Sequence, residues 1–132
     1  MPPQRKSERK PVVWVSSTRK DIRDLPAEVR RAFGNALDEA QQGKKHPDAK
    51  PLTGFGGASV LEVVDDYATD TYRAIYTVRF EEAVYVLHVF QKKSAQGRKT
   101  SQHDLEVVRT RLQQAQALHE EFLQQKGKTS GL

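Results

Sequence analysis

The stretch TYRAIYTVRF-EE-AVYVLHVFQKK, residues 71–93, decides the fold, because two runs of β-branched and aromatic residues flank a short acidic break. Such runs favour β-strands, and two polar residues between them are typical of an antiparallel hairpin. We predict strands over 71–80 and 83–91, joined by a tight turn at Glu81-Glu82. This register gives the following opposed pairs: Phe80 with Ala83, Thr77 with Val86, Ile75 with His88, and Arg73 with Phe90.

Side chains alternate between the two faces of a strand, so the hairpin should have one apolar and one mixed face. The apolar face is expected to lie under helices and carries Tyr72, Ala74, Tyr76, Val78, Phe80, Tyr85, Leu87 and Val89. The mixed face carries Arg73, Ile75, Thr77, Arg79, Val84, Val86, His88, Phe90 and Lys92. Cationic side chains and one aromatic ring therefore gather at one end of the mixed face.

Outside the hairpin, short patterns predict the remaining elements. Residues 12–15 and 59–65 have the β-branched composition of strands. Apolar residues recur every three or four positions over 22–40, and Pro26 divides this segment into two helices. A last helix begins near Ser101, with Asp104 at capping-box spacing. The prediction is an α+β fold: a small, mostly antiparallel sheet of about four strands, two N-terminal helices on one face, and a C-terminal helix.

The length of 132 residues suits one domain. We assign residues 1–11 to a disordered basic arm, 12–125 to the domain and 126–132 to a flexible tail. The absence of cysteine excludes disulfides, thiolate metal sites and cysteine nucleophiles. No secretory signal or membrane-spanning run is visible, so a cytoplasmic protein without membrane contact is expected.

The formal net charge of +5 favours a polyanionic partner such as nucleic acid. On the mixed face, His88 could exchange protons near neutral pH, while Arg73 and Lys92 could stabilise a phosphate that is being attacked. Phe90 could stack on a base. Further candidates for RNA contact are Lys44, Lys45, Lys50, Lys93, Arg98 and Lys99. No metal site or cofactor is predicted, and the structural alternative for Arg73 is an ion pair with Glu62.

Several of these motifs together resemble the RelE/HigB superfamily of bacterial type II toxins, in particular its phage-derived, HigB-like branch. The similarity extends over residues 12–118 and includes the Tyr-Arg-x-x-Tyr strand at 72–76 and the Leu-His-x-Phe-x-Lys-Lys strand at 87–93. A helix of the Asp-x-x-x-x-Arg type follows at 104–109. The chain departs from the branch in having Val64 where an arginine is common, and Arg98 in a stretch that contains a tyrosine in some relatives.

The resemblance implies a RelE-like fold and a ribosome-dependent endoribonuclease that cleaves mRNA in the A site without a metal ion. It also implies an antitoxin partner, often a helix-turn-helix protein. The motif positions carry the catalytic roles over to Arg73, His88 and Lys92, with Lys93 and, more loosely, Lys50 on RNA.

Two other functions are compatible with the same fold. One is a ParE-like inhibitor of DNA gyrase, and the other is a nucleic-acid-binding relative without catalysis. The sequence predicts that Arg73→Ala abolishes toxicity without unfolding the protein.

Overall fold

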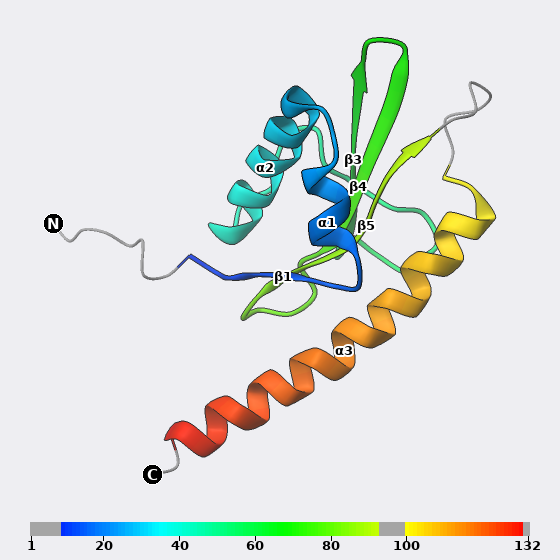
Figure 1. The fold of residues 1–132 in the computed structure, drawn as a ribbon. Coiled ribbons are helices and arrows are strands. Elements are labelled where there is room, and N and C mark those ends of the chain that lie inside the picture. Colours follow the sequence, from blue (N-terminus) through cyan, green and yellow to red (C-terminus); the bar gives the residue numbers. More distant parts are fainter. Residues whose placement is uncertain (1–8, 93–99, 131–132) are drawn as a thin grey trace, which may run out of the picture.

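The computed structural model describes residues 9–92 and 100–130 (Figure 1). In chain order its elements are β1 (Val12–Trp14), α1 (Thr18–Arg23), α2 (Ala27–Gln41), β2 (Lys50–Pro51), β3 (Val60–Tyr67), β4 (Asp70–Thr77), β5 (Val84–Lys92) and α3 (Gln102–Ser130). The predicted break between two N-terminal helices is confirmed, because Pro26 directly precedes α2.

The strands form one five-stranded sheet in the order β1-β5-β4-β3-β2. β1 runs parallel to β5, and the other neighbours are antiparallel. The α+β class and the mostly antiparallel sheet are confirmed. The expected number of about four strands is wrong, because Lys50–Pro51 forms a fifth strand that pairs with β3. A two-residue strand is too short to show any periodicity in the sequence.

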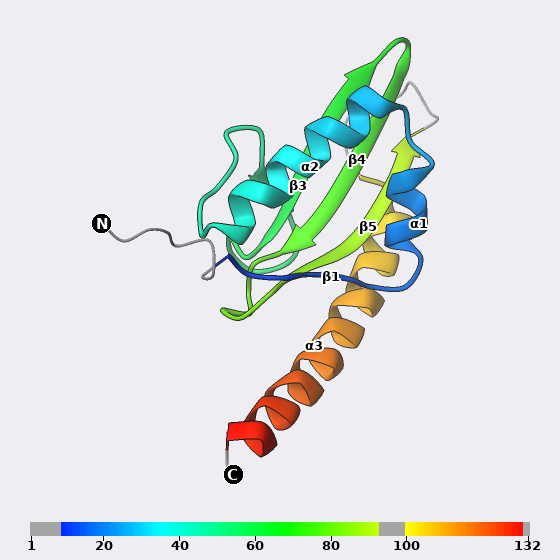
Figure 2. The same ribbon diagram turned by 60° about the vertical axis from the view of Figure 1, so that its left-hand side comes forward.

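The sheet lies between two helical layers (Figures 1 and 2). α1 and α2 cover one face, where Ile22, Val29 and Phe33 pack against Tyr72 and Tyr76. α3 crosses the opposite face, where Val108 and Ala115 pack in a second core. The prediction that both N-terminal helices share one face is confirmed. The mixed face, however, is partly covered by α3.

The β4–β5 hairpin differs from the predicted tight turn. Residues 78–83 form the connection, and the register shifts by one residue between Ile75 and Tyr76. Arg73 still lies opposite Phe90 and Ile75 opposite His88, as predicted, but Thr77 pairs with Tyr85 rather than Val86. Glutamate is a poor residue for the primed turns that close a two-residue hairpin, so a longer connection with a bulge replaces it.

This bulge exchanges the faces of β5 on its N-terminal side, because a one-residue shift reverses which side each side chain faces. Val84 and Val86, expected on the mixed face, pack in the α2 core. Tyr85 and Leu87, expected beneath the N-terminal helices, pack in the α3 core instead. Phe80, which lies in the 78–83 connection, also packs there rather than beneath the N-terminal helices.

α3 begins with the predicted capping box. The backbone N–H of Asp104 donates to Ser101 Oγ at 3.1 Å, and Ser101 Oγ donates to Asp104 Oδ2 at 2.7 Å. The helix continues to Ser130, whereas a tail was expected from residue 126. Its second half extends beyond the sheet (Figures 1 and 2), and Phe122 there is 36% exposed.

Before β1, the described chain is attached to α2. Arg9 forms an ion pair with Asp38, and the Gln41 amide donates to the carbonyl of Lys10 at 2.7 Å. Residues 1–8 lie outside the described part, so the disordered arm stays a prediction there. None of the helices in the described ranges is both long and apolar enough to cross a membrane.

Candidate functional site

Three rows of opposed residues cross the sheet on the face that α3 partly covers. Residues directly opposite in antiparallel strands point to the same side. The register gives the rows Lys50–Glu62–Ile75–His88, Val64–Arg73–Phe90 and Asp66–Thr71–Lys92. Arg73, His88, Phe90 and Lys92 therefore share one face, as predicted, and β2 adds Lys50 at its edge.

Arg73 lies in the sheet face rather than on open surface. Its side chain is 5% exposed, and Nη1 donates to Glu62 Oε2 at 2.9 Å. The same carboxylate oxygen accepts a hydrogen bond from Thr100 Oγ1 at 2.5 Å. The alternative interpretation of Arg73, a cross-strand ion pair with Glu62, is therefore confirmed. Whether Arg73 also acts on a phosphate stays a prediction.

His88 forms a dyad with Asp104, across the junction of β5 and α3. Nε2 of His88 lies 2.8 Å from Asp104 Oδ1, and the two side chains are 12% and 20% exposed. Ser101 holds the other carboxylate oxygen. The Phe90 ring stacks on the imidazole, with 4.2 Å between the ring centroids. Ser101, Asp104 and Phe90 thus fix the orientation of the His88 ring.

The electrostatics favour a neutral imidazole paired with an ionised carboxylate. Burial lowers the pKa of His88; hydrogen bonding to Asp104 opposes this shift, and the Arg111 guanidinium adds to it. Burial would raise the pKa of Asp104, but the hydrogen bonds from His88 and Ser101 outweigh it, so the net shift is downward.

An ionised carboxylate only accepts hydrogen bonds, so Nε2 of His88 carries the proton that is donated to Asp104. Nδ1 of the neutral ring then holds the lone pair. This atom is buried, and no described residue forms a hydrogen bond to it. The dyad therefore combines an oriented histidine with an unused basic nitrogen, which is the arrangement that a general base requires.

The lowered pKa of His88 predicts a loss of stability in mild acid. The unfolded chain binds this proton more readily than the folded chain, so the free energy of unfolding should fall as pH drops below the ordinary value of 6.5. The Asp104 contribution is lost only in a more acidic window, below its ordinary value of 3.8.

Urea titrations at neutral and mildly acidic pH would measure this effect. Asp104 and Arg111 on α3 and Asp21 on α1 all act on the charge of His88. The wild type is therefore compared with His88→Gln, in which these neighbours are unchanged. His88→Gln should lose less stability on acidification than the wild type. Equal losses would show that His88 is not the titrating group.

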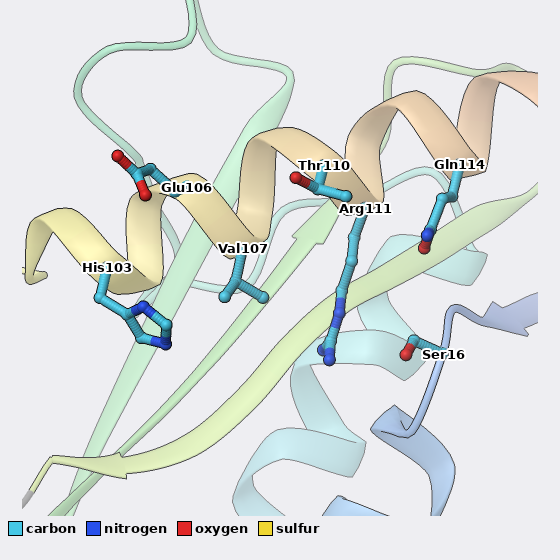
Figure 3. Close-up of a pocket in the computed structure, with 7 residues that line it drawn as sticks. All are labelled: Ser16, His103, Glu106, Val107, Thr110, Arg111 and Gln114. Carbon is cyan, nitrogen blue, oxygen red and sulfur yellow. The ribbon is translucent and has the colours of Figure 1, made fainter.

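A shallow trough of about 310 Å³ lies beside the dyad, between α3 and the turn that precedes α1. Ser16 lines one side, and residues of α3 line the other: His103, Glu106, Val107, Thr110, Arg111 and Gln114 (Figure 3). We call it the Ser16–Arg111 trough.

The other predicted RNA contacts are distributed differently. Lys44 and Lys45 are exposed in the connection between α2 and β2, outside the three rows. Lys93, Arg98 and Lys99 lie outside the described residues, so their predicted roles have no structural counterpart here. None of the described residues forms a group of three or more His, Asp or Glu that could hold a metal ion.

Two residues of the site were not proposed from composition or spacing. Asp104 was recognised as a helix cap and as part of a family motif, but not as the partner of His88. Arg111 follows Asp104 by seven residues and therefore lies on the same side of α3. The seven-residue spacing can be read from the sequence, but the packing of α3 on β5, which brings Arg111 to the site, cannot. Arg109, the arginine of the Asp-x-x-x-x-Arg motif, contacts a different part of the fold: its Cζ atom lies 5.4 Å from the centroid of the Phe55 ring.

Comparison with known proteins gives one family. Residues 20–113 match the family described as "Phage derived protein Gp49-like (DUF891)". This match covers more than half of the chain. The chain belongs to this Gp49-like family. The family is phage-derived and toxin-like, which agrees at that level with the resemblance stated from the motifs. No curated protein and no solved structure matches the chain significantly.

Proposed function

We propose that this Gp49-like protein is the toxin of a type II toxin–antitoxin pair and cleaves mRNA on the ribosome. The observation that carries the proposal is the His88–Asp104 dyad, with its 2.8 Å hydrogen bond and unused Nδ1, on the sheet face that also holds Arg73, Phe90 and Lys92. Membership of a toxin-like family supports the same function.

The proposed reaction is strand cleavage by the RNA itself. Nδ1 of His88 takes the proton of a ribose 2′-hydroxyl, and the oxygen attacks the adjacent phosphorus. The bond from phosphorus to the 5′-oxygen breaks, leaving a 2′,3′-cyclic phosphate on one product. The departing 5′-oxygen takes a proton from water and becomes the hydroxyl of the other product, and protonated His88 releases its proton to solvent. No metal or cofactor takes part in this route.

The cations of the face have a separate role. Negative charge grows on the phosphate as the 2′-oxygen attacks, and positive side chains nearby stabilise it. Lys92 lies two positions after Phe90 on the same side of β5, in the row next to Arg73. We assign the direct phosphate contact to Lys92 and a supporting charge to Arg73, whose guanidinium group pairs with Glu62.

Binding of RNA must also uncover the dyad. Nδ1 of His88 is buried, and Phe90 stacks over the ring. We propose that a nucleotide base takes the place of Phe90 against the imidazole or stacks on the displaced phenyl ring. In this proposal RNA binding precedes catalysis, and an antitoxin that covers this face would prevent it.

The test uses purified protein and ribosomes programmed with a defined mRNA, with primer extension to map breaks. We expect cuts at A-site codons that require the ribosome and persist when EDTA is added to an assembled complex. Lys92→Gln should reduce cutting by roughly tenfold or more, because one phosphate-directed charge is lost.

Intact mRNA under these conditions would contradict the proposal. A gyrase supercoiling assay would then test the ParE-like alternative. Inactivity in both assays, with growth unaffected on induction, would leave a nucleic-acid-binding relative without toxicity.

A further inference from the structure

Arg111 is a half-buried arginine without a carboxylate partner among the described residues. It donates through Nη1 to the backbone carbonyl of Leu87 at 3.1 Å. A guanidinium group has five N–H donors, so this single bond fixes the side chain and leaves donors available. Arg73, which is also at the sheet, is neutralised by Glu62. Among the described residues no carboxylate forms a salt bridge with Arg111, so the Ser16–Arg111 trough holds a positive side chain that its bond to Leu87 keeps in place.

Other hydrogen-bonding groups face the same space. Figure 3 shows His103, Arg111 and Gln114 directed toward one side of α3, where Ser16 lies. Glu106 also borders the trough but points to the other side of the helix. The trough therefore has one acidic side chain at its border, and its hydrogen-bond donors lie on the side of Ser16.

Ser16 has an unusual backbone conformation. Its φ of 58° lies in the left-handed region, which is disfavoured for residues other than glycine. Its hydroxyl has no hydrogen-bond partner within the described ranges. The turn before α1 thus places a free hydroxyl opposite the guanidinium group.

We propose that the Ser16–Arg111 trough binds a phosphate group of the RNA backbone, one or more nucleotides away from the bond that is cleaved. This inference rests on the proposed function and adds a second contact to it. Arginine binds phosphate oxygens through two parallel N–H bonds, and hydroxyl and amide donors can satisfy the remaining oxygens.

Position and shape favour a chain of RNA over a separate small molecule. His103 precedes Asp104 on α3, so the trough begins next to the dyad. Ser16, His103 and Gln114 are exposed, which leaves the trough open along its length. An RNA strand could therefore run from the catalytic face into the trough without a break.

The test compares two neighbouring glutamines of α3. Gln114 lines the trough, while Gln113 is exposed and does not. Gln114→Glu adds a negative charge where the phosphate would bind, and Gln113→Glu adds the same charge outside the trough. The probe is a ribosome programmed with mRNA that carries a 2′-deoxy A-site codon, which cannot be cleaved by the proposed route.

Binding is measured by co-sedimentation over a range of salt concentrations. We expect Gln114→Glu to bind about fivefold more weakly than Gln113→Glu at low salt, since like charges repel at short range. Arg111→Gln should also reduce the slope of log K against log salt by roughly 0.7 to 0.9, as for the loss of one phosphate contact. Ribosomes without mRNA show whether that phosphate belongs to mRNA or to ribosomal RNA.

Two results would overturn the inference. Equal binding by the two glutamate variants, with wild-type cleavage intact, would remove the trough from the RNA path and leave the proposed function standing. A wild-type protein that neither binds ribosomes nor cleaves mRNA would overturn both.

Discussion

Replacement of Arg73 by alanine is expected to lower the free energy of unfolding by about 3 kcal/mol, because breaking a buried pair leaves the other charge uncompensated. The Arg73 and Glu62 side chains are only 5% and 16% exposed. After the substitution, the Glu62 carboxylate would keep its hydrogen bond from Thr100 but lose the guanidinium group. Urea unfolding followed by circular dichroism would measure the change.

The control separates the lost ion pair from the lost side-chain volume. Glu62→Gln removes the charge that Arg73→Ala would leave behind, so the double variant should be less destabilised than additivity predicts. Strict additivity of the two substitutions would show that the ion pair contributes no coupling energy.

This expectation changes how a loss of toxicity is interpreted. The sequence alone predicted that Arg73→Ala abolishes toxicity in a folded protein, but a destabilised toxin could also fail to arrest growth. Arg73→Lys retains a positive charge beside Glu62 and is the better probe of chemistry. Reduced cleavage by a folded Arg73→Lys protein would support a role for the planar guanidinium group.

The register of the central hairpin could be predicted near the site because strand alternation is a local property. Arg73 opposite Phe90 and Ile75 opposite His88 follow from counting along two clear strands. The bulge beyond Ile75 could not be predicted in the same way. It depends on how residues 78–83 connect the strands, and the sequence shows only that Glu81-Glu82 is polar.

That α3 covers the mixed face could not be predicted from the sequence, because it depends on tertiary packing. The apolar spacing of Leu105, Val108 and Leu112 predicts an amphipathic helix but does not say which surface it meets. In the structure this side of α3 packs over β5. For that reason His88 was recognised as a candidate, while its partner Asp104 became evident only from the fold.

The dyad leads to the largest expected effect on activity. His88→Gln should reduce A-site cleavage by roughly 100-fold or more, because general base catalysis typically contributes that much. Asp104→Asn should act through His88: its amide can donate to Nε2, which moves the ring proton to Nδ1 and removes the lone pair that accepts the 2′-hydroxyl proton. Asp104 is therefore a positioning residue rather than a proton acceptor.

A pH profile distinguishes this role from a structural one. Wild-type cleavage should fall as pH drops and His88 becomes protonated, whereas the residual activity of Asp104→Asn should lose that dependence. His46→Gln is the matched control for His88→Gln, since His46 and Asp48 form a second histidine–aspartate pair away from the site, with 4.0 Å between His46 Nδ1 and Asp48 Oδ2. Because Asn preserves the size of Asp104, its folding can be verified by the same unfolding assay. Full activity of a folded Asp104→Asn protein would contradict the tautomer argument, and with it the assignment of Nδ1 of His88 as the base.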